Sequence, residues 1–479
     1  MSELMGMMDS MSVWPSGSLM MLVFAALVIV PFWFIFAKAG FSARAPGDSR
    51  HRRGATEARP GSAMNPARRV SLWLARLLTL AALLGAVQAA TAADAVTRWS
   101  SLICSQAIGD FDPFVSVLMH VAMHDALNAI DPRYARWTAP AHDEPPAAGA
   151  APEAAVAAAA YHVLMGLQPD KTAPIESAYA AALASMPDGP SKRAGLVLGK
   201  AVAAATLARR AADRDVRGTA FSQSNEPGRW RATPPDVDAR PRFGKYEPFS
   251  GAAALDLPVA DPPEPGSSAY LAAVQEARAQ GSAASKERTN AQTDAARFFA
   301  SQSSSLNFLA LAVRLLDARP APADIWESAR TLTLMSIALS DSYILYSYAK
   351  ERFHFWRPIT AIRQGGFGVT ADPGWTPLVE TPEHPEHPSA HATECMAGAT
   401  VLRSVFGNGA QPVTYVATDA FFQPARQYPA FTALADECAA SRVWAGVHFR
   451  TAGEAGQKLG EEIGTYVISK LLRPLNGGE

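Results

Sequence analysis

The chain has 479 residues, with 43 Lys and Arg against 44 Asp and Glu and a formal net charge of −1. This balance excludes a global field that would favour nucleic acid or an acidic membrane surface, so any anion must be recognised locally. Three cysteines are too few for a disulfide scaffold in a domain of this size, although one bridge is open to an exported protein.

Residues 1–92 have the pattern of a membrane or targeting region. Residues 19–37 carry no charge and are long enough to cross a bilayer as a helix. Residues 64–92 follow the order of a secretory signal, with basic residues, an apolar run and an A-x-A segment. Either translation starts at Met64 and cleavage follows Ala92, or both stretches insert as a hairpin with the basic loop inside. A buried helix pair of the fold is the less favoured alternative.

Both export routes place the later residues outside the cytoplasm. We therefore expect a periplasmic or secreted protein, with an inner-membrane tether at the N-terminus if the first apolar stretch is kept.

Helical patterns dominate after residue 93. Residues 114–130, 151–167 and 191–213 have helical spacing or composition, and no run of alternating β-branched residues indicates a strand. The sequence therefore predicts an all-α helical bundle.

Proline-rich connections interrupt these helices at 139–152 and 227–266. The second connection predicts a boundary near residue 267. We expect an N-terminal helical half at 93–266 and a C-terminal helical bundle at 267–479.

The segment from Asp324 to Arg357 predicts one long helix. Its apolar residues recur in steps of three or four, and Lys350, Phe353 and Arg357 continue the same face. Two cations at the end of a core-facing stripe are costly unless a negative group meets them. Because Pro358 pushes Arg357 out of helical geometry, we expect the helix to end there.

The first of three blocks that carry chemistry is Lys350-x6-Arg357-Pro358. Arginine offers a planar fork of donors to two oxygens of an oxyanion, while lysine offers a compact charge. Alone, this block is more typical of a solvated end of an amphipathic helix.

The second block is Pro388-Ser389-Ala390-His391, followed by helical spacing that stops at Gly407. Ser389 stands at the N-cap position, so the amide of Ala390 would point out of a helix N-terminus, where anions bind. His391 lies in the same first turn. A capping role alone also explains Ser389.

The third block is Ser441-Arg442-x5-His448. Arg442 and His448 do not share a helix face, so a turn around Gly446 is needed to bring them together. Thr451 and Glu454 predict a capping box, which places His448 just ahead of another helix N-terminus. A half-buried surface turn with a satisfied histidine is the alternative.

Two histidine clusters raise the question of a metal. His120 and His124 share a helix face at metal-ligand spacing, but no glutamate of an HExxH motif lies between them. In the segment 383–391, Pro385 and Pro388 break any common face. Satisfied histidines are therefore favoured over a zinc site at both places.

In this order, the three blocks resemble the superfamily that joins vanadium-dependent haloperoxidases to type 2 phosphatidic acid phosphatases and bacterial acid phosphatases. Its pattern is Lys-x6-Arg-Pro, Pro-Ser-Gly-His and Ser-Arg-x5-His. Stretches outside the blocks look like the bacterial haloperoxidase branch: 120–134 (HVAMHDALNAIDPRY), 227–235 (PGRWRATPP), 355–363 (FWRPITAIR) and 372–382 (DPGWTPLVETP). The resemblance covers most of residues 95–470.

The resemblance implies a helical-bundle enzyme that holds a tetrahedral oxyanion. The groups that would hold its oxygens are Lys350, Arg357, Ser389, the amide of Ala390 and Arg442. His448 would bind vanadium directly, or attack phosphorus as the nucleophile of a phosphatase, and His391 would be the general acid–base. One cage serves both chemistries because vanadate mimics the phosphoryl transition state.

The resemblance also implies the cofactor and the partners. We expect a vanadate-dependent haloperoxidase-like enzyme that uses hydrogen peroxide, a halide and a small organic substrate. The runner-up is a phosphomonoesterase or lipid phosphatase acting on a phosphomonoester. The alternative of another class is an exported protein that binds the oxyanion without turnover.

Three positions bear on this expectation. Ala390 stands where the family usually has glycine, and its methyl group adds bulk beside the oxyanion. Ala452 stands where many members have an aspartate that orients the imidazole, so we expect a backbone carbonyl or Glu454 to hold His448 instead. His384 matches a position that is aromatic in chloroperoxidases and histidine in algal bromoperoxidases, which predicts a halide pocket there with a preference for bromide.

Overall fold

The computed structural model describes residues 93–105, 113–215, 220–233, 246–253, 257–301, 303–319, 324–409, 412–416 and 425–475. The expected membrane stretch at 19–37, the signal at 64–92 and the start at Met64 lie outside these residues. Within the described ranges, no helix combines the length and the hydropathy needed to cross a bilayer.

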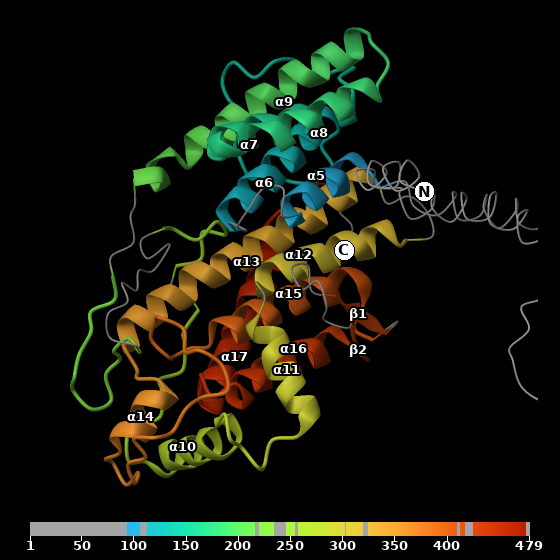
Figure 1. The fold of residues 1–479 in the computed structure, drawn as a ribbon. Coiled ribbons are helices and arrows are strands. Elements are labelled where there is room, and N and C mark those ends of the chain that lie inside the picture. The colour runs from blue at the N-terminus through green and yellow to red at the C-terminus, as the bar shows by residue number, and fades with distance from the viewer. Residues whose placement is uncertain are drawn as a thin grey trace, which may run out of the picture. The chain divides into compact units, whose positions relative to one another are not determined.

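The first group of helices packs around α7, and the side chains of its member α6 are almost all buried (Figure 1). Its members are α5 (Ala95–Cys104), α6 (Pro113–Ile130), α7 (Pro152–Leu167), α8 (Thr172–Ala184) and α9 (Pro190–Arg209), with short 3₁₀ turns η3 (Pro169–Lys171) and η4 (Ala211–Asp215). Helices α7 and α9 pack backbone to backbone at Gly199, where a Cβ would lie 2.2 Å from the Ala155 carbonyl oxygen. Alanine and glycine therefore allow the close approach of these two helices.

The second group of helices carries the three sequence blocks. Its members are α10 (Ser268–Gly281), α11 (Asn290–Ala300), α12 (Ser304–Asp317), α13 (Ile325–Phe353), α14 (Pro358–Gln364), α15 (Ala390–Phe406), α16 (Phe431–Trp444) and α17 (Arg450–Lys470). The described strands form one antiparallel pair, β1 (Val413–Tyr415) with β2 (Arg426–Tyr428). The all-α prediction is confirmed.

Helix α13 of the second group contacts α6 of the first group as well as α15 of its own. It therefore joins the two groups (Figure 1). The boundary expected near residue 267 falls at Ser267, the N-cap of α10. The division of the chain into two halves there stays a prediction.

Helices α15 and α17 are in close contact along a stripe of small residues. A Cβ added at Gly460 would lie 2.2 Å from the carbonyl oxygen of Thr393, and one added at Gly456 would lie 2.6 Å from that of Ser389. Glycine at these positions lets the two backbones meet. The start of α15 is thereby held against α17.

The long helix predicted to run through Arg357 is shorter than expected. Helix α13 ends at Phe353, because His354 adopts a left-handed conformation with φ 48°. Phe355 then forms a bridge with Arg229, which draws the chain away from the helix axis. Pro358 therefore begins α14 rather than ending α13, and Arg357 is the N-cap of α14.

Candidate active site

Lys350 lies in the last turn of α13 and its side chain is 1% exposed. Its ammonium group donates to three backbone carbonyls, those of Pro385 at 2.8 Å, Glu386 at 3.1 Å and Pro388 at 2.5 Å. An ammonium has three donors, so all of them hold the loop that leads into α15. Lys350 therefore brings charge to the site and anchors its loop.

Arg357 is fully buried and joins two segments that are far apart in sequence. Its Nε donates to the His384 carbonyl oxygen at 2.9 Å, and its Nη1 donates to the Val447 carbonyl oxygen at 2.7 Å. The same Nη1 lies 3.0 Å from His448 Nε2, and Nη2 lies 3.0 Å from His384 Nδ1. The first and third blocks, together with His384, therefore meet at this guanidinium.

Arg442 is in the last turn of α16 and is 3% exposed. Its Nε and Nη1 are buried and have no hydrogen-bond partner within the described part of the chain. Its carbonyl oxygen accepts from the amide of Val447 at 3.2 Å and of His448 at 3.3 Å, in a turn where Gly446 has φ 79°. The turn expected around Gly446 is confirmed, and it brings His448 back to Arg442.

His448 is 2% exposed, and its second ring nitrogen meets a carboxylate. Nδ1 lies 3.1 Å from Glu386 Oε1, which also accepts from the Phe449 amide at 2.8 Å. The expectation that Glu454 or a backbone carbonyl holds His448 is wrong, because Glu454 is exposed to solvent and Glu386 takes that place.

The capping box expected at Thr451 is also wrong. Helix α17 begins at Arg450, and its N-cap Phe449 makes no side-chain cap. The Glu386 carboxylate accepts from the Phe449 amide instead, so a distant acid satisfies this helix start. His448 still precedes a helix N-terminus, as the sequence predicted.

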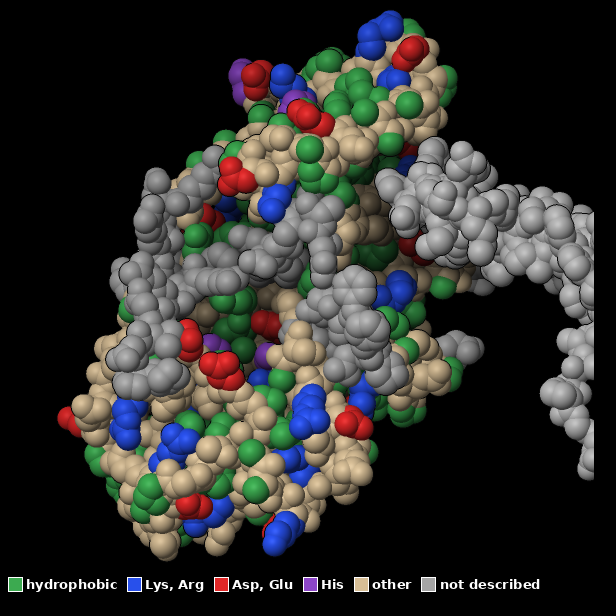
Figure 2. Space-filling model, in the orientation of Figure 1, with side chains coloured by type: hydrophobic (Ala, Val, Ile, Leu, Met, Phe, Trp, Pro, Cys, Tyr) green, Lys and Arg blue, Asp and Glu red, His purple; other side chains and the backbone are tan. Residues whose placement is uncertain are grey.

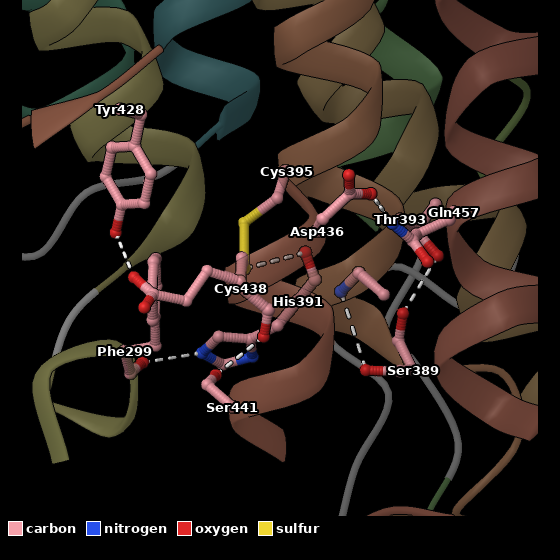
Figure 3. Close-up of a disulfide and its surroundings, with 12 residues drawn as sticks. Phe299, Ser389, His391, Thr393, Cys395, Tyr428, Asp436, Cys438, Ser441 and Gln457 are labelled. Atoms are coloured by element: carbon pink, nitrogen blue, oxygen red, sulfur yellow. Dashed lines mark hydrogen bonds between the residues drawn. A yellow bond between two sulfur atoms is a disulfide. The ribbon is translucent and has the colours of Figure 1, made fainter. Parts of the chain in front are cut away.

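Ser389 is the N-cap of α15, and its hydroxyl oxygen lies 3.5 Å from the Ala392 amide. Ala390 is the first residue of the helix, so its amide belongs to the end that favours anions. His391 is half-buried, and its Nε2 lies 3.0 Å from the Phe299 carbonyl oxygen of α11 (Figure 3). This contact gives the His391 ring a fixed direction.

A disulfide links the helices that carry these groups. Cys395 of α15 is bonded to Cys438 of α16, and the Cys438 sulfur lies 3.6 Å from the His391 carbonyl oxygen (Figure 3). The single bridge that the sequence left open is therefore formed, and Cys104 is free.

Burial and mutual repulsion shift the pKa values of the charged groups. Burial lowers the pKa of Arg442 to about 10 and of Arg357 to about 9, with Glu386 opposing and Arg442 reinforcing the change at Arg357. Burial and then Arg357 hold the pKa of Lys350 and of His448 well below their usual values. Burial raises the pKa of Glu386 to about 7 against the pull of Arg357. The imidazole of His448 is thus neutral, as a ligand or nucleophile must be.

The other two histidines of the site are also neutral. Burial, followed by Lys350 and Arg357, lowers the pKa of His384. Burial, followed by Arg442, lowers the pKa of His391. These effects show that His384 and His391 lie within the field of the same cations.

The structure thus brings the predicted groups into one region. Lys350, Arg357, Arg442, Ser389 and His448 are all buried, while His384 and His391 border them and are half-buried. Buried cations with unpartnered guanidinium nitrogens fit a tetrahedral oxyanion, which supplies both charge and acceptors. The face of the molecule in Figure 2 shows basic and acidic side chains interspersed.

Glu386 was missed as a site residue. The sequence holds one signal for it: without an aspartate at Ala452, another acid had to meet His448. Several acids were available, and only the fold shows which one comes close.

Hydrogen bonds account for His120 of the first histidine cluster. The His120 ring is enclosed by the Ser100 and Ser336 hydroxyls and the Ser116 carbonyl oxygen, at 2.8, 2.9 and 2.7 Å. No group of three or more His, Cys, Asp or Glu able to hold a metal ion occurs in the described ranges.

Residues 330–477 match the family described as the VCPO second helical-bundle domain. The fold is similar to that of a bacterial vanadium-dependent iodoperoxidase, with a TM-score of 0.65 and 23% identity over 80% of this chain and 97% of that chain. No curated protein matches the chain by sequence.

The fold is also similar to those of two crystal structures of bacterial vanadium-dependent chloroperoxidase, one of the apo type and one of the holo type. The apo form has a TM-score of 0.55 at 17% identity, covering 74% of this chain and 92% of that chain. The holo form has a TM-score of 0.56 at 18% identity, covering 74% of this chain and 90% of that chain. Residues 330–477 thus match a helical-bundle domain of this family, and the fold of the chain is similar to that of bacterial vanadium haloperoxidases.

Proposed function

We propose that the chain is a vanadate-dependent haloperoxidase that oxidises a halide with hydrogen peroxide. The observation that carries this proposal concerns Arg442, whose buried Nε and Nη1 have no hydrogen-bond partner among the residues that the structure describes, and which lies near a neutral His448 and two further buried cations. A desolvated guanidinium without partners is costly, and a bound oxyanion removes that cost.

Each residue has a role in this proposal. Arg442, Arg357 and the start of α15 at Ser389 and Ala390 would hold the oxygens of vanadate. Lys350 would add charge from behind the loop that it anchors. Arg357 Nη1 lies 3.0 Å from His448 Nε2, the nitrogen through which His448 would bind the vanadium.

Bound vanadate supplies an electrophilic centre that activates hydrogen peroxide toward a halide. His391 would move protons at the edge of this site. Burial and Arg442 hold its pKa low, so the ring is neutral, and an anion that offsets the charge of Arg442 would raise that pKa.

His384 would border a halide pocket, because its ring contacts Arg357 from the half-buried side of the site. We keep bromide as the preferred halide for this pocket. Small organic molecules would then be halogenated near His384.

The same donors would hold a phosphoryl group, with His448 as nucleophile. A phosphatase is therefore the second candidate, and oxyanion binding without turnover is the third. We also propose that the protein is exported, and the buried Cys395–Cys438 bridge supports this because such bonds persist in oxidising compartments.

The test uses the purified chain. Calorimetry with orthovanadate measures binding, and a dye that accepts halogen reports turnover with hydrogen peroxide and chloride, bromide or iodide. The variant His448→Ala should lose both signals, whereas His142→Ala, at an exposed histidine, should keep them. Hydrolysis of a nitrophenyl phosphate without halogenation would assign the phosphatase instead. Vanadate binding without either reaction would assign the binding protein.

A further inference from the structure

Hydrogen bonds fix both the backbone and the side chain of Glu386. Its amide donates to the Phe355 carbonyl oxygen at 2.9 Å, and its own carbonyl oxygen accepts from Lys350 at 3.1 Å. Its carboxylate is fully buried, with Oε1 between His448 Nδ1 and the Phe449 amide. Hydrogen bonds within the chain therefore hold both the backbone and the carboxylate of Glu386.

The contacts of His448 decide which ring nitrogen carries the proton. Arg357 Nη1 lies 3.0 Å from Nε2 and 3.5 Å from Nδ1, so it does not by itself choose between the nitrogens, whereas Glu386 Oε1 accepts from the Phe449 amide at 2.8 Å and is therefore an acceptor for Nδ1 as well. In a neutral ring the proton is then on Nδ1, and it is donated to Glu386 Oε1 at 3.1 Å. The lone pair of Nε2 consequently faces the buried cations.

We propose that Glu386 is the positioning residue for His448: its carboxylate fixes the Nδ1–H tautomer and aims the Nε2 lone pair at the bound oxyanion. This inference rests on the proposed function for its consequence, whereas the Glu386–His448 pair is a contact within the chain itself. Carboxylates that accept from the far nitrogen of a ligating imidazole fix its orientation and raise its basicity.

The position of Ala452 supports this assignment. Ala452 is fully buried, four residues after His448 and in the first turn of α17, so it offers His448 no side-chain acceptor. Its carbonyl oxygen accepts from the Ser389 amide at 2.9 Å. The carboxylate that contacts His448 therefore comes from Glu386, in the loop held by Lys350, and not from position 452.

The first measurement is the tautomer of His448 in the vanadate-free protein. Long-range ¹H–¹⁵N NMR spectra of histidine-labelled protein distinguish the two tautomers, and His448→Gln assigns the signal. We expect the Nδ1–H form in the wild type and in Glu386→Gln, whose side-chain oxygen still accepts. An Nε2–H form in the wild type would overturn the proposal.

The second measurement is vanadate affinity by calorimetry. We expect Glu386→Leu to weaken binding about 10- to 100-fold, the usual effect of removing such a partner. Glu386→Gln should lose less, because it keeps the acceptor and removes only the charge. The exposed acid in the same loop provides a matched control, and Glu383→Gln should bind like the wild type.

Rescue separates positioning from a general loss of structure. The double variant Glu386→Leu/Ala452→Asp should regain most of the lost affinity, because its new carboxylate lies one helical turn from His448. If the leucine variant does not fold, the same comparison is made with Glu386→Gln and Glu386→Gln/Ala452→Asp. Unchanged affinity in both single variants, or no rescue, would overturn the proposal. A wild type that binds no vanadate would refute the proposed function, while the tautomer would still test the Glu386–His448 pair.

Discussion

Cys395 and Cys438 are bonded to each other, and each lies one helical turn from a residue of the site. Cys395 follows His391 by four residues in α15, and Cys438 precedes Arg442 by four residues in α16. The bridge therefore fixes the distance between the two helices where they enter the site (Figure 3).

Removing this bridge should affect both stability and the site. With a sequence separation of 43, loop entropy predicts a loss of up to about 4 kcal/mol in the free energy of unfolding for Cys395→Ala/Cys438→Ala. Vanadate affinity should fall as well, because His391 and Arg442 gain freedom relative to each other. Denaturant unfolding and calorimetry measure the two effects. Cys104→Ala is the control, and equal behaviour of the two proteins would contradict this prediction.

Arg442 should show opposite effects on binding and on stability. Arg442→Met removes a buried charge whose Nε and Nη1 have no partner in the described residues, so the anion-free protein should be as stable as the wild type or more so. The increase in melting temperature on adding vanadate should disappear. Arg450→Met, at an exposed arginine paired with Glu276, should keep that increase. A vanadate shift that survives in Arg442→Met would remove Arg442 from the site.

His120 should lower the stability of the folded protein in acid. Burial lowers its pKa to about 4 from 6.5, so between these values the unfolded chain binds the proton more readily than the folded one. The contribution of the neutral His120 ring to the free energy of unfolding is fully present above pH 6.5. It is lost as the pH falls toward 4, a change of about 3 kcal/mol. Urea unfolding across this range should show a shallower pH dependence for His120→Gln than for the wild type. Parallel curves for the two proteins would rule out this role.

Replacing two glycines of α17 by alanine should change stability in opposite directions. At Gly460 a Cβ would lie 2.2 Å from the Thr393 carbonyl oxygen, so Gly460→Ala must separate α15 from α17 and should cost roughly 1–3 kcal/mol. At Gly453 the nearest atom would be 3.8 Å away, so Gly453→Ala should stabilise the helix by about 0.5–1 kcal/mol. Chemical unfolding measures both. Similar changes in the free energy of unfolding for the two variants would show that α15 and α17 do not meet at Gly460.

Short-range patterns in the sequence were sufficient to predict the helices that begin the site. The Ser389 N-cap and the Gly407 stop of α15 are confirmed, because capping depends on residues within a few positions of one another. The return of the chain at Gly446 is confirmed for the same reason. Three blocks of side chains suited to one anion also indicated that distant segments converge.

Other features depended on contacts that no local pattern encodes. The end of α13 at Phe353 follows from a pairing with residues 228–230, more than a hundred positions earlier in the chain. The choice of Glu386 over Glu454 as the partner of His448 follows from how Lys350 and Arg357 hold their loop. Composition and spacing along the chain indicate which side chains can bind an anion. The packing of helices against one another decides which carboxylate reaches the His448 imidazole. The distance between carboxylate and imidazole is set by segments that lie far apart in sequence.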